Sequence, residues 1–111
     1  EFVEKLDMLM NDEQRFLDAS LSLRTLAEET GLHPNKLSWL LNDQVGLSFN
    51  DYVNTYRLEC FKEKAQNPDN QSFTLLGLAF DSGFNSKSTF NTFFKKRTGM
   101  TPRSWLKQQR K

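Results

Sequence analysis

The chain carries the same pattern of apolar and small residues twice. The first copy consists of Leu26, Ala27, Gly31, Leu32, Leu37, Leu40, Leu41 and Gly46. The second copy consists of Leu78, Ala79, Gly83, Phe84, Phe90, Phe93, Phe94 and Gly99. One extra residue in the second turn is the only difference in spacing, so both copies are expected to fold on one plan.

Each copy is typical of a helix, a tight turn and a second helix. The small alanine lets another helix approach closely, and the glycine after it supplies the positive backbone dihedral needed at a helix end. In the second helix, apolar residues at i, i+3 and i+4 form one buried stripe. The opposite faces carry Asn35, Lys36, Ser38, Trp39 and Asn42 in one copy, and Ser88, Thr89, Asn91, Thr92 and Lys95 in the other. Two helices joined in this way are the helix-turn-helix, whose second helix enters the major groove of DNA.

The rest of the chain is also predicted to be helical. Helices are expected over 2–17 with a break near Asn11 and Asp12, and then over 21–30, 35–45, 48–66, 74–82, 86–98 and from 101 onward. Their N-caps are predicted to be Ser48, Thr74, Ser86 and Thr101. Because no segment alternates as a strand would, the fold class is predicted to be all-α.

This helix pattern divides the chain into functional segments. Residues 1–20 are interpreted as a helical connection to a missing upstream region, partly because the chain starts at Glu1 and not at Met. Residues 21–53 form the first helix-turn-helix unit, 48–66 the connector helix, and 73–107 the second unit. The connector is apolar on more than one side, which indicates that other segments cover more than one of its faces.

The charges are unevenly distributed, although the formal net charge is only +1. Through Cys60 there are eleven acids and five bases, which gives −6, whereas from Phe61 onward ten bases and three acids give +7. The second copy is therefore expected to hold a phosphate backbone more tightly. Phosphate contacts are predicted for Lys95, Lys96 and Arg97, and for the helix starts near Arg24 and Thr74.

The remaining composition argues against an enzyme or a metal site. His33 is the only histidine and Cys60 the only cysteine, and there is no glycine-rich phosphate loop. We therefore expect no catalytic residues, no metal and no cofactor. This domain is expected to be cytoplasmic, because it has a single cysteine and no apolar run long enough to span a bilayer, whereas the full-length protein could be membrane-linked.

The sequence resembles the DNA-binding domain of the AraC/XylS family of bacterial transcription regulators. The resemblance covers about residues 21–106. It rests on Leu-Ala-x-x-x-Gly in both copies and on the segments Gly46-Leu47-Ser48-Phe49, Tyr56-Arg57-Leu58, Ser88-Thr89-Phe90, Phe93-Phe94-Lys95-Lys96 and Gly99-Met100-Thr101-Pro102. It implies seven helices, with two helix-turn-helix units that read successive major-groove segments about one DNA turn, roughly 34 Å, apart.

The resemblance also assigns site residues. Carried onto matching positions, base or groove contacts fall on Asn35, Lys36, Ser38 and Trp39, and on Lys87, Ser88, Thr89, Asn91 and Thr92. The helix faces and the second helix start add Asn42, Ser86, Lys95 and Lys96 to the candidate DNA-binding residues. The implied partners are double-stranded DNA and an upstream sensor or receiver region, and the full-length protein could form a homodimer.

Some positions leave alternatives open. Phe61 stands where the family usually has a small residue, so the connector is expected to pack differently there. Trp39 replaces a polar or basic groove residue and could either meet DNA or fold back onto the core. Arg57 could contact phosphate, but a structural hydrogen bond to a neighbouring helix is favoured. A module that binds protein instead of DNA is the competing interpretation of the whole chain.

Overall fold

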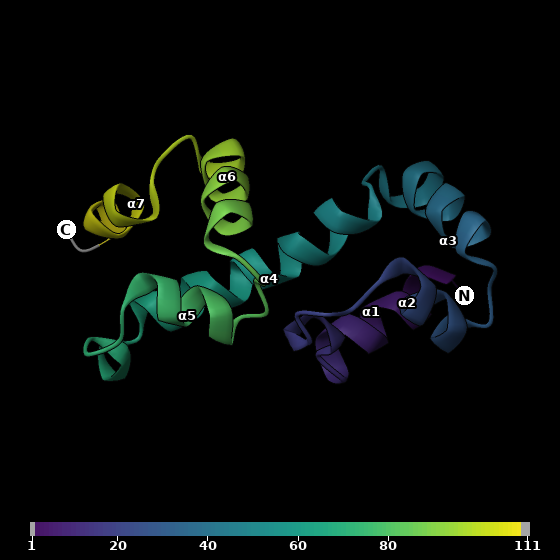
Figure 1. The fold of residues 1–111 in the computed structure, drawn as a ribbon, viewed down its shortest axis with the longest axis horizontal. Helices are drawn as coiled ribbons and strands as arrows, with labels where there is room; N and C mark the ends of the chain where they lie inside the picture. Colours follow the sequence, from purple (N-terminus) through teal and green to yellow (C-terminus); the bar gives the residue numbers. More distant parts are fainter. Residues whose placement is uncertain (1, 110–111) are drawn as a thin grey trace. The chain divides into compact units, whose positions relative to one another are not determined.

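The computed structural model describes residues 2–109, and these form seven α-helices without a β-strand (Figure 1). The α-helices are α1 (Phe2–Asp7), α2 (Leu23–Thr30), α3 (Pro34–Leu40), α4 (Phe49–Gln66), α5 (Leu75–Asp81), α6 (Lys87–Thr98) and α7 (Pro102–Gln109). Single turns of π-helix follow α1 and α3, at Met8–Asp12 and Leu41–Val45, and 3-10 turns lie at Arg15–Leu17 and Pro68–Asn70. The all-α prediction is confirmed. None of the described helices is long and apolar enough to cross a membrane.

The chain divides into two compact units, with the boundary between Tyr56 and Arg57. The first unit holds α1, α2, α3 and the start of α4, and the second holds the remainder of α4 with α5, α6 and α7. Each unit therefore contains one of the two sequence copies. The first residue of the predicted upstream connection, Glu1, lies outside the described residues.

Two helix predictions need correction. The helix expected over 35–45 is α-helical only to Leu40 and then widens into a π-turn, which Gly46 closes by donating its N–H to the Leu41 carbonyl at 2.8 Å. The further helix expected before residue 17 is a single 3-10 turn. It starts after Gln14, whose φ of 51° takes the backbone into the left-handed region that α-helices exclude.

The hydrophobic core of the first unit consists of apolar side chains from all of its helices. Its fully buried members are Leu6, Met10, Leu26, Leu37, Leu41 and Val53. Leu40 was expected on the same stripe but is only half-buried. An Arg15–Glu29 ion pair, with Nε donating to Oε1 at 3.0 Å, joins the segment before α2 to α2 itself.

Tyrosines on α4 complete the first unit. The Tyr56 hydroxyl donates to the Asp7 carboxylate at 3.1 Å, and the Tyr56 ring stacks on Phe16 with 5.9 Å between centroids. Tyr52 is buried beside it, with its ring edge-on to Tyr56 at 5.3 Å. Burial raises the pKa of Tyr52 above its ordinary value, because ionisation would leave a charge in an apolar site.

The second unit is built around aromatic rings. Phe61 on α4 is fully buried and meets Phe90 at 4.8 Å and Phe94 at 5.6 Å, both edge to face. Phe84 and Trp105 extend the cluster, through Phe90 at 5.1 Å and Phe94 at 5.8 Å. The large residue at position 61 thus lies at the centre of the aromatic cluster of this unit. A single cluster of rings holds α6 against α4 and α7.

Candidate nucleic-acid interface

The helix caps set where each helix-turn-helix unit begins. The Ser22 and Thr74 hydroxyls accept the N–H groups of Thr25 and Gly77, at 3.1 and 2.9 Å, and so start α2 and α5. The predicted caps Ser48 and Thr101 are confirmed in the same way, each accepting from the N–H three residues further on at 3.1 Å. Side-chain caps of this kind satisfy N–H groups that have no partner inside the helix.

The caps also define which positions of α3 correspond to which positions of α6. Ser86 accepts the Thr89 N–H at 3.1 Å and donates to the Thr89 hydroxyl at 2.9 Å, which confirms it as the cap of α6. His33 is the N-cap of α3, because its Nδ1 accepts the Asn35 N–H at 3.1 Å. Counted from these caps, Leu37 matches Phe90 and every later residue of α3 and its π-turn matches one of α6. The extra residue of the second turn, Asn85, precedes the cap and leaves this register unchanged.

The outer face of α6 is polar and exposed along its length. Phe90, Phe93 and Phe94 point to the core, and the exposed candidates are Lys87, Ser88, Thr89, Asn91, Thr92, Lys95 and Lys96. The half-buried Ser86 contributes through its capping hydroxyl. All eight predicted residues of the second copy therefore lie on α6 or at its first turn. Hydroxyl, amide and ammonium groups on one helix face are those that hydrogen-bond base edges and phosphates.

The corresponding face of α3 combines short polar groups with a tryptophan. Asn35, Lys36 and Asn42 are exposed, and Ser38 is half-buried. Trp39 is 56% exposed, and the Lys36 ammonium lies 5.4 Å from its ring centroid. Of the two alternatives for Trp39, folding back onto the core is wrong. The indole stands on the same side as the other candidates, held by a cation–π contact.

The two faces differ most in charge at their C-terminal ends, which are the π-turn after α3 and the last turn of α6. Asn42 and Asp43 on the first unit match Lys95 and Lys96 on the second, and the Asn42 side chain donates to the Ser38 carbonyl of its own helix at 3.1 Å. The last turn of α6 also carries Arg97, whose guanidinium lies 5.2 Å from the Phe93 ring. The end of α6 is therefore positively charged, whereas the matching turn of the first unit carries the negative charge of Asp43.

Other residues considered from the sequence lie elsewhere. Arg57 is buried at 8% exposure, which agrees with the structural role favoured for it. Cys60 is half-buried and free. No group of three or more His, Cys, Asp or Glu side chains within residues 2–109 is arranged to hold a metal ion. The capping role of His33 was missed by sequence reasoning, although its position directly before Pro34 was the available signal.

Comparison with known proteins shows the family to which the chain belongs. A family model described as a helix-turn-helix domain matches residues 26–108, which span both units. The chain belongs to the AraC/XylS family. Domains of this AraC/XylS type are DNA-binding parts of transcription regulators and not an enzyme class.

Individual relatives agree with the AraC/XylS assignment. An uncharacterised HTH-type transcriptional regulator of Bacillus subtilis, YtdP, is 28% identical over 93 residues, which are 84% of this chain but 12% of that protein. The XylDLEGF operon transcriptional activator 3 of Pseudomonas putida is 26% identical over 94 residues, which are 85% of this chain and 28% of that protein. A solved structure of a Listeria innocua protein of unknown function superposes with a TM-score of 0.81 at 27% identity and covers 96% of both chains. The chain thus spans a small part of the length of its curated relatives.

Proposed function

We propose that this chain binds double-stranded DNA in a sequence-specific manner, with α3 and α6 as recognition helices that enter successive major-groove segments. The observation that carries the proposal is the common register of α3 and α6. Both helices begin at a side-chain cap, and Leu37 and Leu41 are buried where Phe90 and Phe94 are buried. Asn35 and Lys36 are polar and exposed at the positions that Ser88 and Thr89 occupy. Two unrelated surface helices would have no reason to share this arrangement.

The chemistry of the two faces assigns different tasks to different side chains. Asn91, Thr92 and Ser88 on α6, with Asn35 and Ser38 on α3, carry short donors and acceptors suited to base edges in the major groove. Lys87 and Thr89 on α6, Lys36 on α3 and Asn42 on the π-turn after α3 lie beside them and add further donors to the groove-facing side. Lys95 and Lys96 on α6 are suited to phosphates, which position the protein without reading sequence. Trp39 offers an apolar surface for a thymine methyl group or a sugar, and Ser86 holds the start of α6 in place.

The domain would act as the output part of a longer regulator. The curated relatives carry most of their length outside the matched segment, and both are named as transcription regulators. We propose that an upstream sensing or receiver region controls this domain. A homodimer of the longer protein would present four recognition helices to one operator.

The proposal is tested by selecting bound sequences from a pool of random duplex DNA and sequencing them, at two salt concentrations. Two short motifs about one helical turn apart, roughly 34 Å, are expected to be enriched, and binding should weaken at the higher salt. One motif alone would assign sequence reading to one helix. No enrichment at either salt would reject DNA recognition and favour a protein-binding module.

Two substitutions separate base contacts from phosphate contacts. Asn91→Ala should relax preference at one base pair, at a cost of about 1–3 kcal/mol against the selected sequence. Lys95→Gln should instead weaken all sequences alike and reduce the salt slope by about 0.9. Equal behaviour of the two variants on selected and random duplexes would contradict these assignments on α6.

A further inference from the structure

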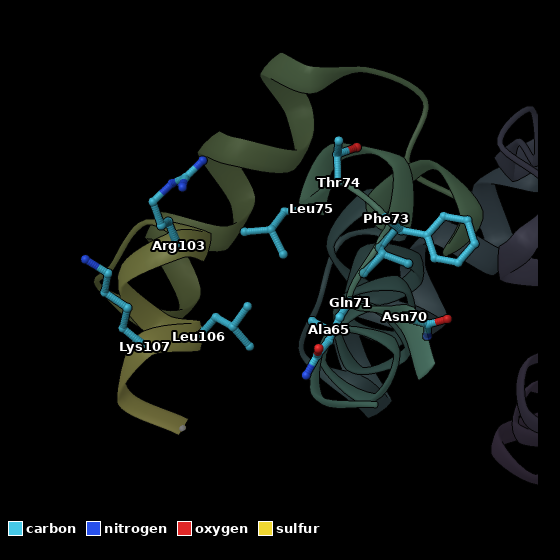
Figure 2. Close-up of a pocket in the computed structure, with 10 residues that line it drawn as sticks. Ala65, Asn70, Gln71, Phe73, Thr74, Leu75, Arg103, Leu106 and Lys107 are labelled. Atoms are coloured by element: carbon cyan, nitrogen blue, oxygen red, sulfur yellow. The ribbon is translucent and has the colours of Figure 1, made fainter. Parts of the chain in front are cut away.

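The second unit contains a groove that the DNA-binding face does not use. It has a cavity volume of about 370 Å³ and lies between α7 and the segment that runs from the end of α4 to the start of α5. Its apolar lining comes from Ala65, Phe73, Leu75, Leu78 and Leu106. Figure 2 shows Leu75 and Leu106 pointing toward each other across the gap between α7 and α5. An elongated apolar group could lie between these two leucines.

The α7 side of the groove is cationic. Arg103 and Lys107 both line it, and they stand four residues apart and so on the same side of α7 (Figure 2). Both side chains are exposed, and neither has a carboxylate partner among residues 2–109. No acidic residue lines the groove. The rim therefore carries two positive charges that the described part of the chain does not neutralise.

We propose that this groove binds a small amphiphilic carboxylate, with its apolar tail between Leu75 and Leu106 and its carboxylate on Arg103 and Lys107. The cavity volume falls within the range of about 300–1,000 Å³ typical of small-molecule sites, which combine an apolar lining with a few charged groups that fix orientation. A guanidinium can hold a carboxylate through two parallel hydrogen bonds. This proposal does not rest on DNA binding, because none of these four groove residues is a candidate DNA contact and the test below contains no DNA.

The experiment follows backbone amide shifts of the ¹⁵N-labelled chain during titration with sodium octanoate. Saturable shifts are expected at Leu75, Arg103 and Leu106, with a dissociation constant on the order of 1 mM or below, as suits a ligand of about ten heavy atoms. Sodium acetate supplies the charge without the tail, and octyltrimethylammonium supplies the tail with the opposite charge. Neither should give saturable shifts at these amides.

Substitutions at the rim test the charge. The double variant Arg103→Gln/Lys107→Gln should raise the dissociation constant for octanoate at least about tenfold. Arg103→Glu/Lys107→Glu should reverse the preference toward octyltrimethylammonium. Because both positions are exposed, these variants should keep the helical circular dichroism of the parent. Lys5→Gln/Arg24→Gln removes the same charge from the first unit and should leave octanoate binding unchanged.

Three results would overturn the proposal. Equal shifts with acetate would show surface ion pairing only. Equal binding of octyltrimethylammonium by the parent would show partition of an alkyl chain without charge recognition. Tighter binding of the acidic peptide acetyl-EELLEE-amide than of octanoate at the same amides would assign the groove to a protein segment.

Discussion

Reversing the charge of Asp43 should strengthen DNA binding by the first unit. Asp43 lies ten residues after the cap of its helix, at the position that Lys96 occupies on α6. It is exposed and makes no ion pair with any residue from 2 to 109. Asp43→Lys therefore breaks no ion pair within residues 2–109, and a lysine near the end of a helix is favoured by the helix dipole. The folded state should not lose stability.

The magnitude follows from Coulomb's law and counterion release. Reversing one unit charge about 7 Å from a phosphate in water changes the energy by about 1.2 kcal/mol before salt screening. A Debye length of about 10 Å reduces this to about 0.6 kcal/mol, which is equivalent to about threefold in affinity. A new phosphate contact also steepens the salt slope by about 0.9. Between 50 and 200 mM salt, that increment alone changes the affinity ratio of variant to parent by about 3.5-fold. Asp43→Asn, which only removes repulsion, should give a smaller gain and little change in slope.

The assay is fluorescence anisotropy of a labelled duplex carrying the selected sequence, titrated at several salt concentrations. Asp12→Lys is the matched control, because Asp12 is also exposed in the first unit and the net charge changes equally, but Asp12 belongs to the π-turn after α1 and not to α3 or its π-turn. Only Asp43→Lys should steepen the slope. If both variants changed affinity and slope alike, net charge would explain the effect, and the placement of the end of α3 against DNA would be refuted.

Other substitutions test the cores and the exposed tryptophan. Phe61→Ala should cost about 3–5 kcal/mol of unfolding free energy, because it empties the centre of the aromatic cluster, and a urea titration followed by circular dichroism would show it; a cost below 1 kcal/mol would contradict the packing. In Trp105→Phe, which leaves Trp39 as the only tryptophan, fluorescence should change on adding the selected duplex, whereas an unchanged spectrum would place Trp39 away from DNA. The pKa of Tyr52 is raised in the folded state above the ordinary tyrosine pKa near 10. Below about pH 10 both states are protonated, so this stabilisation of the folded state is fully present. Above about pH 10 the unfolded chain ionises first, so the free energy of unfolding should fall as pH rises. Unfolding free energies of the parent and of Tyr52→Phe between pH 8 and 11 would show a steeper decline in the parent, and parallel curves would argue against this effect.

Local chemistry made much of the fold predictable. Ser48, Thr74, Ser86 and Thr101 were all recognisable as caps, because a hydroxyl next to an apolar-periodic segment needs only its own neighbours to act. The buried phenylalanines of α6 followed from their spacing in the same way. The polar face of α6 was predictable as the complement of that stripe, although its contacts with DNA remain a prediction.

Features that apolar spacing does not report were not predictable. Phe61 was recognised as a departure, but its partners Phe90 and Phe94 lie about thirty residues away. The side taken by Trp39 was undecided, because its position borders both the polar face and the half-buried Leu40. The π-turn after α3 depends on a hydrogen bond to Gly46 that apolar periodicity does not report.

The aromatic cluster of the second unit couples the folding of α6 to that of the whole unit. Rings from α4, α6 and α7, with Phe84 before α6, contact one another in an unbroken series. To detach, α6 would have to expose Phe90, Phe93 and Phe94 together, so fraying of this helix is coupled to loss of the whole core. Its outer side chains are therefore presented on a rigid backbone before any encounter, and association loses little conformational entropy there.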